Sequence, residues 1–145
     1  MLVQHVTQLK DELDSLTLVT TKHPRSLKGA KFFETSNINL DSIKKQTTVF
    51  EGNAAEAVKL FPANINVSVA LSLAGFGLDK TIVTIIADPS LKINIHEIVV
   101  DGEFGHMISR TENVPSPVNP KTSYLAALSA VATFKRIIDP IKIGT

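Results

Sequence analysis

The chain has 145 residues, 43% of them hydrophobic, and no cysteine, so we expect residues 1–145 to form a single domain that folds without disulfides or thiolate metal sites. Fifteen scattered Lys and Arg residues against fourteen Asp and Glu give a formal charge of +1, which argues against nucleic-acid binding. No basic leader opens the sequence and no apolar run approaches the roughly 20 residues of a membrane span, so we expect a soluble cytoplasmic protein with no membrane partner.

The first third of the chain is expected to alternate between helix, strand and loop. Apolar residues at spacings of three and four indicate a short N-terminal helix, and a β-branched run that ends before Pro24 indicates a strand. Asn39 is a suitable cap for a brief helix. The predicted elements are a helix over Val3–Leu13, a strand over Leu16–Thr21, mostly loop over 24–40, a brief helix capped at Asn39–Asp41 and running through Lys45, and a strand over Thr47–Glu51.

The segment Phe50–Gly75 is predicted to be the centre of the fold. Asn53 is a good N-cap for an alanine-rich helix that ends before Pro62. A second helix, from near Asn64 to about Ala74, is so apolar that we expect it to be buried, with the glycines that follow ending it in a positive-φ conformation.

The last third of the chain is predicted to hold three strands and the longest helix. Asp101-Gly102 is a typical hairpin turn, and Asn119-Pro120 is a typical helix start. Helices that cluster away from a run of antiparallel strands predict an α+β fold with one sheet covered by helices on one face. The predicted elements are strands over Thr81–Ala87, Ile93–Val100 and Glu103–Glu112 and a helix over Asn119–Ile138.

Few residues indicate chemistry by themselves. The sequence has no glycine-rich phosphate loop, and its four histidines show no metal-ligand spacing, so we expect no metal site. His96 shares a strand face with Asn94, Ile98 and Val100; it is either a partly buried, hydrogen-bonded histidine, the simpler interpretation, or a proton-transfer group. His106 is interpreted as solvent-facing.

Two helix starts carry polar residues whose role the pattern leaves open. Amides at the start of Asn119–Ser123, together with the charge of Lys121, could bind a carboxylate or phosphate, although most such helix starts bind only water. Asn64 and Asn66 are either helix caps or ligand-binding residues.

Taken together, an ordered series of motifs resembles the C-terminal domain of the L-aspartate dehydrogenase family. The motifs are FEGNAAEAVKLFPANINVSVALSLAG, TIVTIIADP, NIHEI, GEFG and ENVPSPVNPKTSYLAALSA, preceded by LTLVTTKHPRSLKG, and they cover roughly Leu16 to Ile138. The resemblance implies an α+β domain similar to the C-terminal half of glyceraldehyde-3-phosphate dehydrogenase-like enzymes. In that fold a mixed, largely antiparallel sheet packs helices on one face and pairs with a second subunit through the other, which implies a homodimer.

The resemblance also implies a reaction and a set of site residues. The reaction is NAD(P)-dependent oxidation of L-aspartate to iminoaspartate, which hydrolyses to oxaloacetate and ammonia or enters NAD biosynthesis. His96 of NIHEI matches the active-site histidine, and Asn66 of FPANIN matches an asparagine that contacts the nicotinamide cofactor. Asn64, Lys121 and Thr122 match the surroundings of the substrate carboxylate.

The family carries an N-terminal Rossmann domain, and this chain begins where the last helix of that domain would return. We therefore expect little dehydrogenase activity from the chain alone, with NAD or NADP binding only if a separate Rossmann-domain chain supplies the nucleotide site. Whether the chain is itself an enzyme stays open. The alternative is a non-catalytic module that binds a small dicarboxylate or drives oligomerisation.

Overall fold

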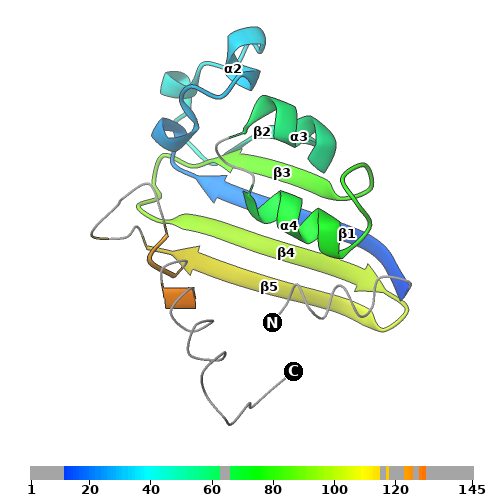
Figure 1. The fold of residues 1–145 in the computed structure, drawn as a ribbon. Coiled ribbons are helices and arrows are strands. Elements are labelled where there is room, and N and C mark those ends of the chain that lie inside the picture. The colour runs from blue at the N-terminus through cyan, green and yellow to red at the C-terminus, as the bar shows by residue number, and fades with distance from the viewer. Residues whose placement is uncertain (1–11, 63–65, 115–116, 118–122, 126–127, 130–145) are drawn as a thin grey trace.

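The computed structural model describes residues 12–62, 66–114, 117, 123–125 and 128–129, which form one five-stranded sheet with short helices (Figure 1). The strand order is β2-β3-β1-β4-β5. β1 runs parallel to β3, and the other neighbouring strands pair antiparallel, so the mixed, largely antiparallel α+β sheet is confirmed. The strands are β1 Leu13–Lys22, β2 Thr47–Asn53, β3 Ile82–Ala87, β4 Asn94–Gly102 and β5 Gly105–Asn113.

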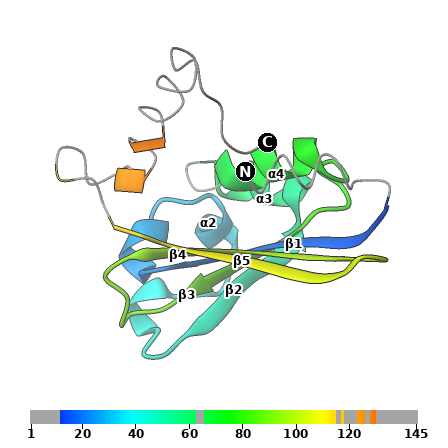
Figure 2. The ribbon, with the colours of Figure 1, turned by 90° about the horizontal axis from the view of Figure 1, so that it is seen from below.

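Two helices, α3 (Ala54–Leu60) and α4 (Asn66–Ala74), lie on the same face of the sheet (Figure 2). Alternate residues of each strand point to this face, because successive side chains of a strand project to opposite sides. Two clusters of buried side chains result. One lies under α3 and includes Phe61, Val83 and Ile85, and the other lies under α4 and consists of Leu13, Leu16, Leu18, Leu71 and Val100.

The segment 24–40, expected to be mostly loop, contains two short helices that were not predicted, η2 (Pro24–Leu27) and α2 (Phe32–Thr35). Tertiary contacts account for α2, because the Phe32 ring stacks on the fully buried Phe61 with ring centroids 5.2 Å apart. Phe33 packs edge-on against the same ring at 5.9 Å. An aromatic cluster of this kind stabilises a four-residue helix that local propensity would not.

Two helix ends lie where the sequence predicted a capping residue. Asn39 accepts a hydrogen bond from the Asp41 amide at 3.0 Å, as predicted, but the helix that it caps, η3 (Leu40–Ser42), ends before Lys45. At the end of α4, Gly77 has a φ of 83° and its N–H donates to the Ser72 carbonyl at 2.7 Å, which confirms a glycine-dependent stop.

Two predictions near the start of the chain and in the centre need correction. Residues 3–11 of the predicted helix Val3–Leu13 lie outside the described part of the chain, but Leu13 belongs to strand β1 and pairs with Gly102. α4 is buried on one side only, since Leu71 is fully buried whereas Leu73 is 76% exposed. The high apolar content of this helix therefore did not mean burial all round.

The predicted hairpin between β4 and β5 exists, but its turn is two residues further on. Asp101 and Gly102 are strand residues, and the turn is formed by Glu103 and Phe104. A Cβ atom on Gly102 would lie 2.3 Å from the Glu12 carbonyl oxygen, so this glycine permits a close backbone approach rather than a turn. The predicted helix Asn119–Ile138 is described only at 123–125 and 128–129.

We expect replacement of Asn53 by alanine to destabilise the protein by about 1 kcal/mol. Asn53 accepts from the Glu56 amide at 2.8 Å, and the Glu56 carboxylate accepts from the Asn53 amide at 3.3 Å, which forms a capping box at the start of α3. Urea unfolding measures the change. Lys59→Ala, at the other end of the same helix, is the control; equal stability of Asn53→Ala and the native protein would contradict the prediction.

Candidate functional site

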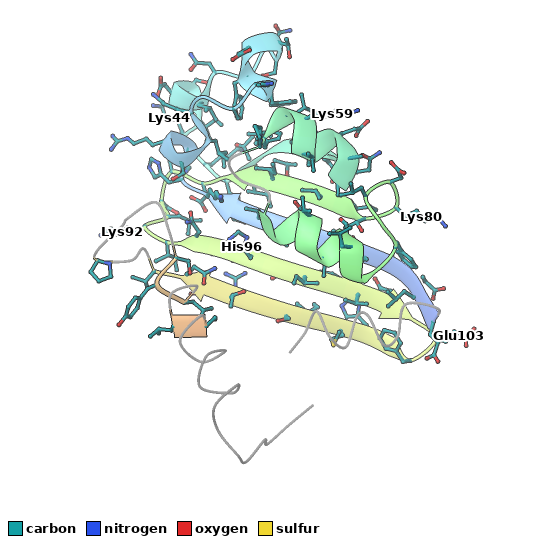
Figure 3. The ribbon with its side chains drawn as sticks, viewed as in Figure 1. Lys44, Lys59, Lys80, Lys92, His96 and Glu103 are labelled. Carbon is teal, nitrogen blue, oxygen red and sulfur yellow. The ribbon has the colours of Figure 1, made fainter. Side chains whose placement is uncertain are left out.

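His96 lies on β4, directly opposite Thr20 of β1 and on the face of the sheet that the helices cover. Its Nδ1 atom and the Thr20 hydroxyl are joined by a hydrogen bond of 3.1 Å. Because Thr20 engages Nδ1, the Nε2 atom is the ring nitrogen that can meet a ligand. Figure 3 shows His96 toward the end of the sheet to which the arrow of β1 points.

The ring of His96 is held in its neutral form. Burial, followed by the nearby charge of Lys22, lowers its pKa from 6.5 to about 4. Both causes act in the same direction, because a low-dielectric surrounding and a positive neighbour each disfavour a second positive charge. At neutral pH His96 is therefore a proton acceptor.

Lys22 is the neighbour that sequence reasoning missed. It ends β1, two residues beyond Thr20, so both side chains project to the helix-covered face. Its exposed fraction is only 9%, and this burial lowers the pKa of its ammonium group. The alternation Leu16, Leu18, Thr20, Lys22 was the signal that could have identified it, because period-two spacing places all four side chains on one face.

Amide and hydroxyl side chains continue the polar end of this face. Asn94 lies two residues before His96 on β4 and pairs with the buried Asn113 at the end of β5. The Ser123 hydroxyl reaches the Asn113 side chain at 3.4 Å. Residue 123 of the predicted ligand-binding helix start is thus placed at the same sheet edge as Asn94.

The other predicted site residues are only partly placed. Asn66 is the first residue of α4, whose start lies toward the His96 end of the sheet while its end packs near the β4–β5 hairpin (Figure 1). Asn64, Lys121 and Thr122 lie outside the described residues. Their assigned roles, like that of the Asn66 side chain, stay predictions.

The neutral state of His96 should make the protein less stable as the pH falls from 6.5 to 4. In this window the unfolded chain binds a proton at the histidine and the folded chain does not, so protonation favours unfolding. A pKa difference of this size corresponds to roughly 3 kcal/mol when fully developed. Chemical denaturation at a series of pH values measures the slope.

His96→Gln is the control for this pH dependence, because glutamine does not titrate. The variant should lose the slope between pH 6.5 and 4, whereas further loss of stability at lower pH should be shared, since the lowered carboxyl pKa values of Asp41, Asp88 and Asp101 remain. Equal slopes in the two proteins would show that His96 is not buried in its neutral form.

His106 lies on the opposite face of the sheet and is exposed, as predicted. Its Nδ1 atom lies 2.6 Å from one carboxylate oxygen of Asp101, and the other oxygen accepts from the Ser15 hydroxyl at 2.8 Å. These contacts connect β1, β4 and β5 near the hairpin. They hold the strand register and give His106 no part in the His96 site.

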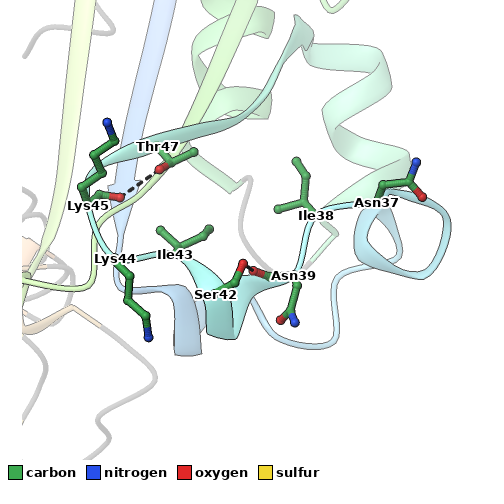
Figure 4. Close-up of a pocket in the computed structure, with 8 residues that line it drawn as sticks. All are labelled: Asn37, Ile38, Asn39, Ser42, Ile43, Lys44, Lys45 and Thr47. Atoms are coloured by element: carbon green, nitrogen blue, oxygen red, sulfur yellow. Dashed lines mark hydrogen bonds between the residues drawn. The ribbon is translucent and has the colours of Figure 1, made fainter.

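A separate surface hollow of about 510 Å³ lies around η3 (Figure 4). Its wall is hydrogen-bonded within itself, since the Ser42 hydroxyl donates to the Asn39 carbonyl at 2.7 Å and the Thr47 hydroxyl to the Lys45 carbonyl at 2.9 Å. His96 and Lys22 do not line this hollow. It is lined by Asn37, Ile38, Asn39, Ser42, Ile43, Lys44, Lys45 and Thr47.

Two further features are absent from the described residues. No group of three or more His, Asp or Glu residues in that part of the chain could hold a metal ion. Nor is any helix there long and apolar enough to cross a membrane.

The fold and the site define an α+β sheet domain with a neutral histidine and a buried lysine at the polar end of its helix-covered face. Over residues 5–137 the sequence matches the family described as "Aspartate dehydrogenase, C-terminal". The chain belongs to this family, and the predicted resemblance is confirmed.

Individual relatives give the same result. The L-aspartate dehydrogenase of Methanococcoides burtonii is 62% identical over 131 residues, which are 90% of this chain and 48% of that protein. The Nitrosopumilus maritimus L-aspartate dehydrogenase is 60% identical over 138 residues, 94% of this chain and 51% of that protein. The crystal structure of aspartate dehydrogenase from Thermotoga maritima superposes with a TM-score of 0.73 at 31% identity, covering 97% of this chain and 51% of that one. The chain thus spans about half the length of these relatives.

Proposed function

We propose that this chain is the substrate-binding and dimerising half of an L-aspartate dehydrogenase-like oxidoreductase. The observation that carries the proposal is His96, a neutral base fixed by Thr20 on the helix-covered face of the sheet. Family membership supplies the substrate class, because the similar relatives are named L-aspartate dehydrogenases. The substrate is therefore L-aspartate, a small dicarboxylate.

In this reaction His96 acts as a general base. Oxidation of L-aspartate to iminoaspartate removes a hydride from Cα and a proton from the amine, and water then converts the imine to oxaloacetate and ammonia. The Nε2 atom of His96 accepts a proton from the amine or from the attacking water, and Thr20 holds the ring in place through Nδ1.

The redox step needs NAD or NADP, which accepts the hydride. No strand in the described part of the chain leads through a glycine-rich turn into a helix, so the residues there do not fit the phosphates of a dinucleotide. We propose that a separate Rossmann domain binds them and that the chain is inactive as a dehydrogenase without it. Asn66 is proposed to contact the nicotinamide ring, which is a different part of the cofactor from the phosphates.

The face of the sheet turned away from α3 and α4 is the proposed dimer interface. No described helix covers it over β1, β4 and β5 (Figure 2), and Ile108 on it is 55% exposed. Polar residues such as Thr17 and Glu97 lie among its apolar ones, and exposed apolar residues gathered on one uncovered sheet face are typical of an interaction surface. Its apolar residues are Val19, Ile82, Ile86, Ile95, Val99 and Ile108.

The second candidate is a module that binds a small dicarboxylate or drives oligomerisation without redox chemistry. The pKa of His96, about 4, favours it, because a histidine of such low basicity is a poor proton acceptor unless a ligand raises its pKa. The two candidates share a binding site and differ in whether the His96 side chain acts on the substrate.

Calorimetric titration of the chain with L-aspartate, oxaloacetate and NAD, each alone and in pairs, tests the proposal. We expect a dicarboxylate to bind without NAD. If none of the three binds, the substrate-binding function and the role of His96 are both rejected, and a dimerising role alone is left.

A further inference from the structure

Lys22 is a buried cation at the polar end of an otherwise apolar sheet face. Leu16 and Leu18 precede it on the same face of β1 and belong to the core under α4. Lysine is seldom buried to an exposed fraction of 9%, because removing an ammonium group from water is unfavourable.

The position of Lys22 is fixed by the backbone around it. Its carbonyl accepts from the Asp88 amide at 2.9 Å, and its Cα pairs with that of Ala87 on β3. The side chain starts two residues beyond Thr20, which lies opposite His96, so Lys22 is a diagonal neighbour of His96 on one face. Its charge acts on the imidazole ring, consistent with this placement.

We propose that the ammonium group of Lys22 binds a carboxylate of the substrate and holds that substrate beside His96. The inference rests on the proposed function and adds a residue that the family resemblance did not assign. An ammonium group in a water-poor site forms strong charge-assisted hydrogen bonds with a carboxylate. L-Aspartate carries two carboxylates, one of which Lys22 would engage while the amine faces Nε2 of His96.

Binding would also change the basicity of His96. A carboxylate placed between Lys22 and the ring offsets the positive charge, so the pKa of His96 rises from about 4 toward its ordinary value. Glu97 and Glu112, the carboxylates that flank His96 on β4 and β5, project to the opposite face. Substrate binding would thus convert a weak proton acceptor into a better one.

The test compares Lys22→Met with Lys92→Met in the full chain. Methionine is one atom shorter than lysine and is an unbranched side chain without a charge, and Lys92 is an exposed lysine in the turn before β4 (Figure 3). Calorimetry gives the dissociation constants for L-aspartate and for two ligands in which one carboxylate is an amide, L-asparagine and L-isoasparagine.

We expect Lys22→Met to weaken L-aspartate binding by about 10- to 100-fold and Lys92→Met to leave it unchanged. The ligand in which an amide replaces the carboxylate held by Lys22 should bind poorly to the native protein. Lys22→Met should not weaken the binding of that ligand further. Lys22→Gln serves as a second, polar variant if the methionine variant does not fold. NMR titration of His96 should show its pKa rise when succinate is added to the native protein but not to the Lys22 variants.

The outcomes separate this inference from the proposed function. If the native chain binds L-aspartate and the Lys22 variants bind it equally well, Lys22 does not hold the substrate, while the proposed function stands. The same conclusion follows if each amide binds more weakly than L-aspartate by the same factor in Lys22→Met as in the native chain. If the native chain binds no dicarboxylate, the proposed function fails, and the role of Lys22 fails with it.

Discussion

Replacement of His96 by alanine is expected to lower kcat/KM for L-aspartate by about 100- to 10,000-fold, the usual contribution of a general acid or base. The assay combines the chain with a Rossmann domain supplied as a separate chain, plus NAD or NADP. Alanine removes Nε2 and also breaks the 3.1 Å hydrogen bond to Thr20. Because the neutral ring is the proton acceptor in the proposed mechanism, the loss should appear mainly in kcat.

Two control variants test whether the loss of rate is specific to the His96 ring. His106→Ala removes an exposed histidine on the other face of the sheet and should leave the rate unchanged. Thr20→Val keeps the ring but removes the hydroxyl that orients it, so we expect a smaller loss that is also seen mainly in kcat. A fully active His96→Ala enzyme, or one that loses only affinity for L-aspartate, would show that His96 is not the proton acceptor of the reaction. A native chain that stays inactive with the Rossmann domain and either cofactor would instead favour the non-catalytic binding module.

Where the sequence predicted structure correctly, the determining contacts were local. Asn53 and Glu56 form a capping box across three residues, and Gly77 ends α4 with a single positive-φ residue. Such features depend on the residue types within one turn, so they can be predicted without knowledge of the rest of the fold. The start of α3 was correct for this reason.

The failures came from contacts between distant parts of the chain. The β4–β5 turn was expected at Asp101, but Ser15 of β1 and His106 of β5 hold that carboxylate within the sheet. The helix α2 depends on the packing of Phe32 against Phe61, which are far apart in sequence. Tertiary packing of this kind overrides local propensity.

The candidate site shows the same division. The family resemblance identified His96, but a pattern of residues in one strand does not show which residue of another strand lies beside it. Thr20 and Lys22 become its neighbours only because β1 pairs with β4 in one register. Lys22 went unnoticed because a lysine at a strand end is usually solvent-exposed, and its burial depends on the fold of the whole domain.

Substitution of Ile108 by arginine is expected to convert a dimeric protein into a monomer. Ile108 lies on β5, next to Val99 of β4, in the open sheet face that we propose as the interface. In a two-fold dimer each subunit contributes one new arginine to the interface, and both charges are removed from water. This should raise the dimer dissociation constant at least about 100-fold. Sedimentation equilibrium measures the constant.

Leu73→Arg is the matched control, because Leu73 is also a large aliphatic residue, 76% exposed, but belongs to α4 on the helix-covered side of the sheet. It should leave the dimer intact, and both variants should fold, since each new side chain starts from an exposed position. A native protein that is monomeric at concentrations of tens of micromolar would overturn the proposed interface. Dissociation caused by Leu73→Arg but not by Ile108→Arg would instead move the interface to the side of the sheet on which α4 lies.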